Sequence, residues 1–182
     1  MKRWKKILLM LAAAVLAPVV YFQVWTLTGR VATVDRGRLY RSAALPAERL
    51  AGLCRQHGIT TVVDLRTEPT ETAAEATALR RAGITHVSLP TGQVPTSDVV
   101  ARFLQLMDEK HREPVLIHCA QGYGRSGVFT AIYRMEYQGW SNRRAMLEEI
   151  VVFGATSFWP GTDKGRFLSA YKPRRPAVPG HW

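Results

Sequence analysis

One short stretch of the chain, residues 115–127, contains the residue types needed for a complete reaction. It reads Val-Leu-Ile-His-Cys-Ala-Gln-Gly-Tyr-Gly-Arg-Ser-Gly. The apolar residues at its start predict a short buried strand, and apolar residues at positions 128, 131, 132 and 135 predict a helix that begins near Ser126. A glycine-rich loop between a strand and a helix N-terminus is suited to binding an anion, because its backbone N–H groups and the helix dipole face the same point.

The loop also contains a nucleophile. Cys119 stands at its head, in a field that favours thiolate over thiol, and a fall of the pKa from about 8.5 to about 5.5 would correspond to about 4 kcal/mol. Arg125 offers a planar two-pronged donor for two phosphate oxygens. The residues predicted to surround a bound phosphate are Ala120, Gln121, Gly122, Tyr123, Gly124 and Arg125.

These residues resemble the signature of the cysteine-dependent protein tyrosine and dual-specificity phosphatases. That signature is His-Cys, five residues, Arg, Ser or Thr, then Gly, and the chain matches it at His118, Cys119, Arg125, Ser126 and Gly127. Further stretches look like the small bacterial branch of the family: Leu-Tyr-Arg-Ser at 39–42, residues 58–66, and the pairs Tyr133-Arg134 and Gly139-Trp140. The resemblance therefore covers roughly residues 35–155.

The resemblance implies hydrolysis of phosphate monoesters through a phosphocysteine intermediate. Cys119 would attack phosphorus, while Arg125 and the loop amides hold the equatorial oxygens. Ser126 would hydrogen-bond the thiolate, and His118 would orient the loop without touching substrate. No metal or organic cofactor is implied.

The family also uses an aspartate on an upstream loop as general acid. The corresponding segment, residues 90–98, has one carboxylate, Asp98, which we take as the candidate acid. Its position at a helix start equally fits a cap or dipole partner. Weaker candidates are Glu68, Glu71 and His86, whereas Asp64 and Arg66 are expected to be structural.

Three other interpretations of the loop stay open. Cys119 could be a small buried hydrophobe. A cysteine six residues before an arginine also occurs in sulfur-transfer loops and arsenate reductases. Because the general acid is not clearly identified, the chain could also be a phosphate-binding pseudophosphatase without catalytic activity. On substrate, Ala120, Gln121 and Tyr123 add no cation to the loop, which favours phosphotyrosine, with a membrane phospholipid or other small phosphoester as the alternative.

The N-terminal segment predicts a membrane anchor. Residues 2–6 contain four positive charges, and the 21 residues from Ile7 to Leu27 contain no charge, which is long enough to span a bilayer as a helix. A cleaved signal peptide is the competing interpretation, but the apolar run continues beyond Ala17 and Pro18. With the basic cluster retained in the cytoplasm, the body would be periplasmic or extracellular.

Net charge and cysteine content exclude several classes of partner and scaffold. The net charge is +11, but the chain has no helix of interleaved arginines and aromatic residues, so no nucleic-acid partner is expected. Two cysteines exclude a disulfide-stapled scaffold and a zinc motif. Cys54 is expected in the core, although a disulfide that traps oxidised Cys119 stays open.

The body alternates strands and helices as a single α/β domain. We expect helices at 46–57, 70–81, 97–110, 126–138 and 142–153, and strands at 60–65, 84–89 and 115–117. They predict a central, mostly parallel sheet flanked by helices, with the site at the carboxyl end of a strand. The expected organisation is an anchor at 1–27, a linker at 28–37, the phosphatase domain at 38–171, and a basic, Pro-rich tail at 172–182.

Overall fold

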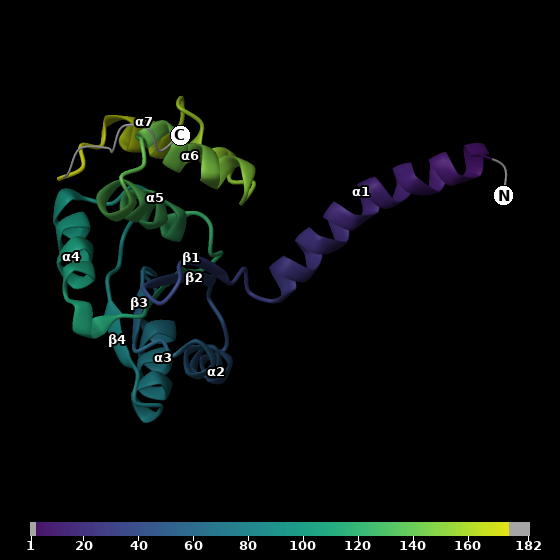
Figure 1. The fold of residues 1–182 in the computed structure, drawn as a ribbon. Helices are drawn as coiled ribbons and strands as arrows, with labels where there is room; N and C mark the ends of the chain where they lie inside the picture. The colour runs from purple at the N-terminus through teal and green to yellow at the C-terminus, as the bar shows by residue number, and fades with distance from the viewer. Residues whose placement is uncertain (1–2, 175–182) are drawn as a thin grey trace.

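A computed structural model describes residues 3–174, and Figure 1 shows one α/β body with a long helix projecting from it. The projecting helix is α1 (Arg3–Leu27), of 25 residues, with no buried residue. The body contains the strands β1 (Ala32–Asp35), β2 (Leu39–Ala43), β3 (Thr61–Asp64), β4 (Thr85–Ser88) and β5 (Val115–Cys119). Its helices are α2 (Ala47–His57), α3 (Pro69–Arg81), α4 (Ser97–Asp108), α5 (Arg125–Gln138), α6 (Asn142–Val151) and α7 (Asp163–Ala170), with 3-10 turns η1 (Lys110–Arg112) and η2 (Thr156–Phe158).

The five strands form one mixed sheet in the order β1-β2-β5-β3-β4. Only β1 and β2 pair antiparallel, and the other three pairings are parallel. Strand β5 is central and every one of its residues is buried, which explains why its sequence is a continuous apolar run followed by His118 and Cys119. The prediction of a mostly parallel α/β domain is confirmed.

Helices cover both faces of the sheet, and each face has its own core. Helices α2 and α3 lie on one face, and α4 to α7 lie on the other (Figure 1). Cys54 belongs to the core under α2, together with Leu50 and Leu79. Cys119 belongs to the larger core on the opposite face, with Phe103 and Phe129. Both cysteines are free, and the sheet separates them, so this fold gives no support to a Cys54–Cys119 disulfide.

Local signals explain several of the helix ends. Gly58 and Gly139 have φ angles of 65° and 66° at the C-caps of α2 and α5, as expected for left-handed capping residues. Ser141 caps α6 by accepting a hydrogen bond from the N–H of Arg144. The helix predicted at 142–153 ends slightly earlier, at Val151, with Val152 as its C-cap.

Two of the expected boundaries differ in the structure. The range predicted as a linker, 28–37, includes β1, which pairs with β2 and is therefore part of the sheet. The expected loose tail begins at 172, yet Arg174 binds Asp108 and Glu136 on the body. Residues 175–182 of that tail lie outside the described residues.

Candidate active site

The loop between β5 and α5 brings its donors together around the sulfur of Cys119. The Gly122 N–H donates to Sγ at 3.3 Å, and Ser126 Oγ lies 3.5 Å from it. Burial alone would raise the pKa of this thiol. The hydroxyl and N–H of Ser126 and the N–H groups of Gly122 and Gln121 outweigh that effect and lower the pKa below its ordinary value. The loop therefore favours a thiolate, as the sequence predicted.

Glycine at two positions of this loop is required by space. Gly122 has a φ angle of 75°, and a Cβ there would lie 2.4 Å from the backbone nitrogen of Ala43. A Cβ at Gly127 would lie 2.5 Å from Glu149 Oε2 and 2.8 Å from the ring of Phe158. Any side chain at either position would displace the loop or the first turn of α5.

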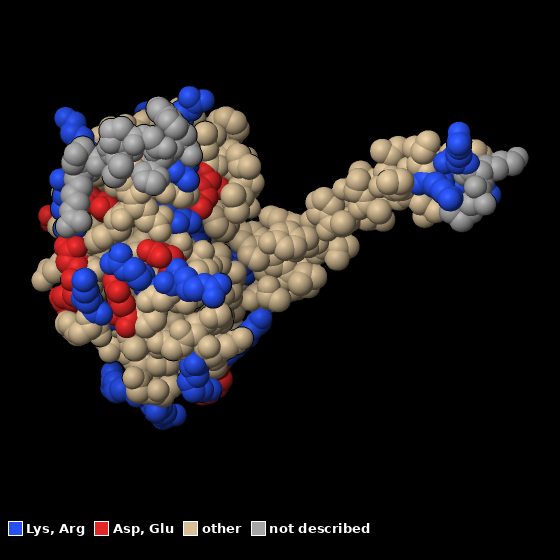
Figure 2. All heavy atoms as spheres, viewed as in Figure 1, with Lys and Arg blue, Asp and Glu red and all other residues tan. Residues whose placement is uncertain are grey.

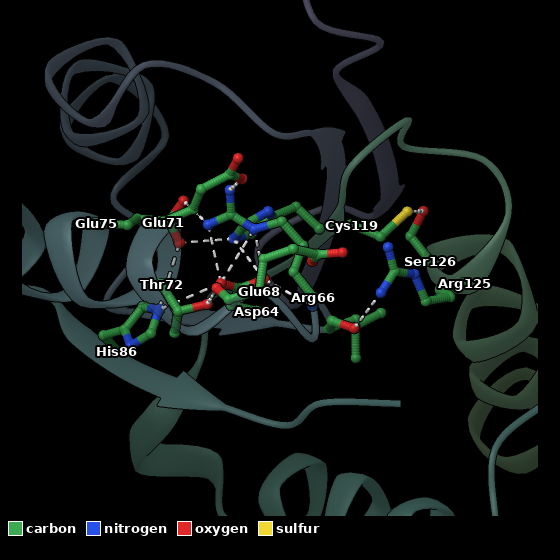
Figure 3. Close-up of polar contacts among 12 residues, drawn as sticks. Asp64, Arg66, Glu68, Glu71, Thr72, Glu75, His86, Cys119, Arg125 and Ser126 are labelled. Atoms are coloured by element: carbon green, nitrogen blue, oxygen red, sulfur yellow. Dashed lines mark hydrogen bonds and ion pairs between the residues drawn. The ribbon is translucent and has the colours of Figure 1, made fainter. Parts of the chain in front are cut away.

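Arg125 is anchored at the edge of the same pocket. Its guanidinium donates to the carbonyl oxygen of Leu65, at the end of β3, at 3.1 Å (Figure 3). A pocket of about 400 Å³ opens beside Cys119 and Arg125, and its lining also includes Ala120, Gln121, Tyr123, Gly124, Gln93, Ser157 and Lys164. The predicted loop residues therefore surround one cavity, apart from Gly122, which is buried beneath it.

Lys164 is a member of this pocket that the sequence analysis missed. Its side chain is buried, and Nζ is the nearest heavy atom, at 3.2 Å, to a Cβ built on Gly124. Burial lowers the pKa of this lysine, and the charge of Arg125 lowers it further, while Cys119 and Glu149 oppose both effects. No motif could have identified Lys164, because α7 carries it to the loop from 45 residues downstream of Cys119.

A buried ion pair supports the loop from below. Arg41 donates to the carbonyl oxygen of Gly122 through Nε at 3.3 Å and through Nη2 at 3.0 Å. Its third contact is with Glu149 Oε1 at 2.6 Å, and both side chains are fully buried. Burial raises the pKa of Glu149 to about 7, while the charge and hydrogen bond of Arg41 act in the opposite direction. Only the stretch at 39–42 in the sequence pointed to Arg41, and nothing pointed to Glu149.

His118 faces away from the pocket into a buried polar cluster. Its Nε2 lies 2.8 Å from Glu75 Oε1, and His86 Nε2 lies 3.3 Å from the same oxygen. Burial alone would raise the pKa of Glu75, but hydrogen bonds from His118 and His86 and the charge of Arg66 lower it. His118 is thus placed to orient β5 and the start of the loop, in the position that the signature implied.

The cluster around Arg66 contains the one group of possible metal ligands among residues 3–174. Asp64, Glu75 and His86 bring their ligand atoms within 4.8 Å of one another. However, Arg66 contacts Asp64 Oδ2 at 2.9 Å and Glu75 Oε2 at 2.7 Å (Figure 3). A guanidinium therefore already neutralises these carboxylates, which fits the structural role expected of Asp64 and Arg66 better than a metal site.

The candidate general acids lie apart from the pocket lining. Asp98 is exposed in the first turn of α4 and does not line the cavity at Cys119. Glu68 is exposed just before α3; hydrogen bonds to backbone N–H groups, first its own, lower its pKa, and Arg125 adds to this effect. Glu71 pairs with Arg66 at 3.1 Å, and the His86 side chain is 8% exposed within the buried cluster.

Comparison with known proteins identifies the family. A family model described as "DSP-PTPase phosphatase fused to NAD+ Kinase" matches residues 15–157. The chain belongs to this family. The resemblance to cysteine-dependent phosphatases predicted from the loop signature is therefore confirmed.

Relatives of this DSP-PTPase chain include a bacterial dual specificity protein phosphatase. The present chain is 36% identical over 114 residues to the dual specificity protein phosphatase TpbA of Pseudomonas aeruginosa strain UCBPP-PA14. The aligned residues make up 62% of this chain and 49% of TpbA. The corresponding protein of strain PAO1 is 35% identical over the same length. The chain thus spans about half the length of the curated relatives it matches.

Solved structures agree with this assignment. The crystal structure of P. aeruginosa TpbA matches with a TM-score of 0.66 at 26% identity, over 80% of this chain and 86% of that one. A cysteine-to-serine variant of TpbA in complex with phosphotyrosine matches with a TM-score of 0.56 at 28% identity, over 76% of this chain and 93% of that one. The core catalytic domain of the PP-IP phosphatase SIW14 from S. cerevisiae, at 23% identity and a TM-score of 0.65 over 78% and 85% of the two chains, shares the fold.

Proposed function

We propose that this chain hydrolyses phosphate monoesters through a phosphocysteine intermediate and acts on protein phosphotyrosine, in the manner of a dual-specificity phosphatase. The observation that carries the proposal is the convergence of Ser126 and the loop N–H groups on the sulfur of Cys119, with Arg125 at the edge of the same cavity. The family supports the activity, and the phosphotyrosine complex of TpbA supports the substrate class.

In the first step, the Cys119 thiolate would attack phosphorus, forming an S–P bond as the bond to the leaving oxygen breaks. Arg125 and the N–H groups of residues 120–125 would hold the three equatorial oxygens, on which the transition state spreads its charge. Water would then attack phosphorus and release inorganic phosphate and the thiolate, which the Ser126 hydroxyl stabilises as a leaving group. Lys164 would add a second cation beside the transferred group.

The leaving oxygen also needs a proton, for which we keep Asp98 as the proposed donor. The residue would have to reach the pocket by movement of the segment 90–98, of which Gln93 already lines the cavity. A catalytically silent phosphate-binding protein is the alternative if no residue supplies this proton. Turnover of a generic aryl phosphate separates the two possibilities.

The covalent mechanism is tested with Cys119→Ser. We expect this variant to lose turnover of an aryl phosphate and to retain binding of a phosphotyrosine peptide, because Arg125 and the loop amides remain. Arg125→Lys should also be severe, since a point charge cannot replace a planar two-pronged donor. Measurable turnover by Cys119→Ser, or activity of Arg125→Lys within a few-fold of the parent, would contradict these roles.

One observation favours a second class of substrate. The sequence favoured phosphotyrosine because Ala120, Gln121 and Tyr123 add no cation to the loop, but Lys164 reaches the same cavity from α7. A membrane phospholipid or another small phosphoester therefore remains the alternative. Comparing kcat/KM for a phosphotyrosine peptide with that for phospholipid in vesicles decides between them.

We further propose that α1 anchors the protein in a membrane as a single span, with the body outside the cytoplasm. Its most apolar stretch has a mean hydropathy of 2.3, and none of the helix is buried against the body. The basic residues before it favour this orientation. Full-length protein should then stay with membranes after high-salt washing, and protease added to spheroplasts should cleave the body. Release by salt, or protection of the body, would reject this topology.

A further inference from the structure

The body exposes its large apolar side chains in one short segment. Outside α1, the described residues include four large apolar side chains that are exposed: Leu147 at 41%, Val151 at 75%, Val152 at 65% and Trp159 at 53%. Leu147 and Val151 belong to α6, Val152 directly follows it and Trp159 directly follows η2; we call these four residues the apolar ridge. Scattered exposed apolar residues are ordinary on a protein surface, but their restriction to 13 consecutive positions points to a contact.

The Val152 end of the ridge lies beside the end of α1. The ring of Phe153, which directly follows Val152, lies 5.8 Å from that of Trp25 in the last turns of α1. Tyr21, Phe22, Val152 and Phe153 line one cavity between α1 and the end of α6. Figure 2 shows the uncharged surface of α1 continuing onto the body where the two meet. A bilayer that contains α1 would therefore have its surface close to the ridge.

The end of α1 is also connected to the phosphate loop. Arg30, three residues after the helix, donates to the carbonyl oxygen of Gln121 at 2.8 Å, and its guanidinium lies over the Tyr123 ring at 4.7 Å. Arg30 holds a φ angle of 50°, which is uncommon for a residue other than glycine. Tyr123 and Ser157 line both the cavity at Cys119 and a second cavity against Phe22. The catalytic pocket therefore adjoins the cavity that lies against the end of α1.

We propose that the apolar ridge is a membrane-docking surface that rests in the headgroup region of the bilayer entered by α1. Val151 and Val152 would be withdrawn from water, and Trp25 and Trp159 would lie at the interface, which aromatic side chains favour. The domain would then be held at a fixed tilt, with the pocket at the lipid surface. Its substrates would be phosphate groups carried close to the bilayer. The occupant is the bilayer and not a second copy of the chain, because the Val152 end of the ridge adjoins α1, the proposed membrane span.

The first experiment measures depth and is independent of catalysis. Nitroxide labels are attached at Val152→Cys, at Val15→Cys in α1 and at Ala74→Cys on α3, each in the full chain with Cys119→Ser; native Cys54 is fully buried. In nanodiscs of phosphatidylcholine and phosphatidylglycerol, collision with oxygen and with an aqueous nickel complex reports the depth of each label. We expect position 15 deep in the bilayer, position 152 in the headgroup region and position 74 in water.

Several results would overturn the proposal. If position 152 were as accessible to nickel as position 74, the ridge would not dock. If position 15 were also in water, the anchor itself would be wrong, and with it the docking surface. Dipolar broadening between labels at position 152 that disappears on dilution with unlabelled protein would assign the ridge to a second copy of the chain instead.

A second experiment measures the consequence for the proposed activity, on which it rests. The double substitution Val151→Asp and Val152→Asp is compared with Ala74→Asp, an exposed position on the opposite side of the sheet. With a lipidated phosphotyrosine peptide in nanodiscs, we expect turnover by the double variant to be at least tenfold lower than that of the parent. Turnover by Ala74→Asp should equal that of the parent. A soluble aryl phosphate should be hydrolysed by all three proteins within twofold. Equal turnover of the lipidated peptide would overturn the docking, whereas no turnover of either substrate by the parent would instead reject the proposed function.

Discussion

The fully buried guanidinium of Arg41 joins the phosphate loop to α6, since it donates to both the Gly122 carbonyl and Glu149. Replacing it by methionine leaves two buried acceptors unsatisfied, each worth about 1–3 kcal/mol. We expect Arg41→Met to lower stability by about 2–6 kcal/mol, measured as thermal unfolding in detergent micelles, and to lower turnover because the loop loses its support.

A matched control comes from an exposed pair. Arg166 binds Asp163 on the surface of α7, and exposed pairs contribute about 1 kcal/mol or less. Arg166→Ala should therefore leave both the melting temperature and the turnover nearly unchanged. Similar losses in Arg41→Met and Arg166→Ala would show that the buried contact has no special role.

The pH at which Cys119 becomes reactive should depend on Ser126. Burial raises the pKa of the Cys119 thiol, and the Ser126 hydroxyl makes the largest single contribution to lowering it; the N–H of Ser126, which Ser126→Ala retains, adds a smaller one. A hydrogen bond to a charged group is worth about 1.5–3 kcal/mol, so Ser126→Ala should raise the pKa of Cys119. The rate of alkylation by iodoacetamide would then rise at a correspondingly higher pH.

The lowered pKa of Cys119 also makes the stability of the fold depend on pH. A thiol whose pKa is lower in the folded state stabilises the fold above its unfolded pKa, and this contribution is lost as the pH falls through the folded pKa. Ser126→Ala should reduce that contribution. Thr130→Ala is the control, because the buried Thr130 hydroxyl has no hydrogen-bond partner among the described residues. An unchanged alkylation profile in Ser126→Ala would remove the assigned role.

The central part of the fold could be predicted because its local signals agree. In β5 and α5, an apolar run, a glycine-rich turn and a helical period follow one another, and the signature places the nucleophile between them. Strand β2 was not predicted as a strand, because Arg41 and Ser42 are polar, yet both are fully buried. Tertiary contacts with Gly122 and Glu149 make that burial favourable for Arg41, and sequence alone does not reveal them.

The missed site residues have the same explanation. Helix α7 has eight residues, with Gly165 as the third, so its sequence gives only a weak helical signal. Its position against the loop depends on close packing: a Cβ at Gly165 would lie 1.9 Å from the carbonyl oxygen of Trp159. Lys164 therefore reaches the pocket through a long-range contact that no spacing rule predicts.

Lys164 provides a test of the pocket beyond the signature. Lys164→Met keeps much of the side-chain volume and removes the cation beside Gly124. Because a positioned donor at a developing charge is worth about a hundredfold in rate, we expect kcat for a phosphotyrosine peptide to fall by about that factor. Lys110→Met, at an exposed lysine in η1, is the control and should retain full activity. Equal activity of the two variants would place Lys164 outside the mechanism.

The last prediction concerns the proton for the leaving group. Tyrosine is a poor leaving group, so its phosphate ester needs a general acid more than an activated aryl phosphate does. If the segment 90–98 brings Asp98 to the pocket, Asp98→Asn should lower turnover of a phosphotyrosine peptide by about a hundredfold or more and affect the activated ester less. Stopped-flow and steady-state assays with both substrates measure this difference.

The exposed position of Asp98 in the first turn of α4 defines the opposite outcome. The N-cap of α4 is Thr96, so the carboxylate of Asp98 interacts with the helix dipole, which is worth about 0.3–1 kcal/mol and is lost in Asn. If Asp98 has only this role, Asp98→Asn will leave both rates nearly unchanged and lower the melting temperature slightly. Glu68→Gln is the matched comparison, because Glu68 is also exposed and lies in the field of Arg125. A loss restricted to the phosphotyrosine peptide in Glu68→Gln, and absent in Asp98→Asn, would transfer the acid role to Glu68.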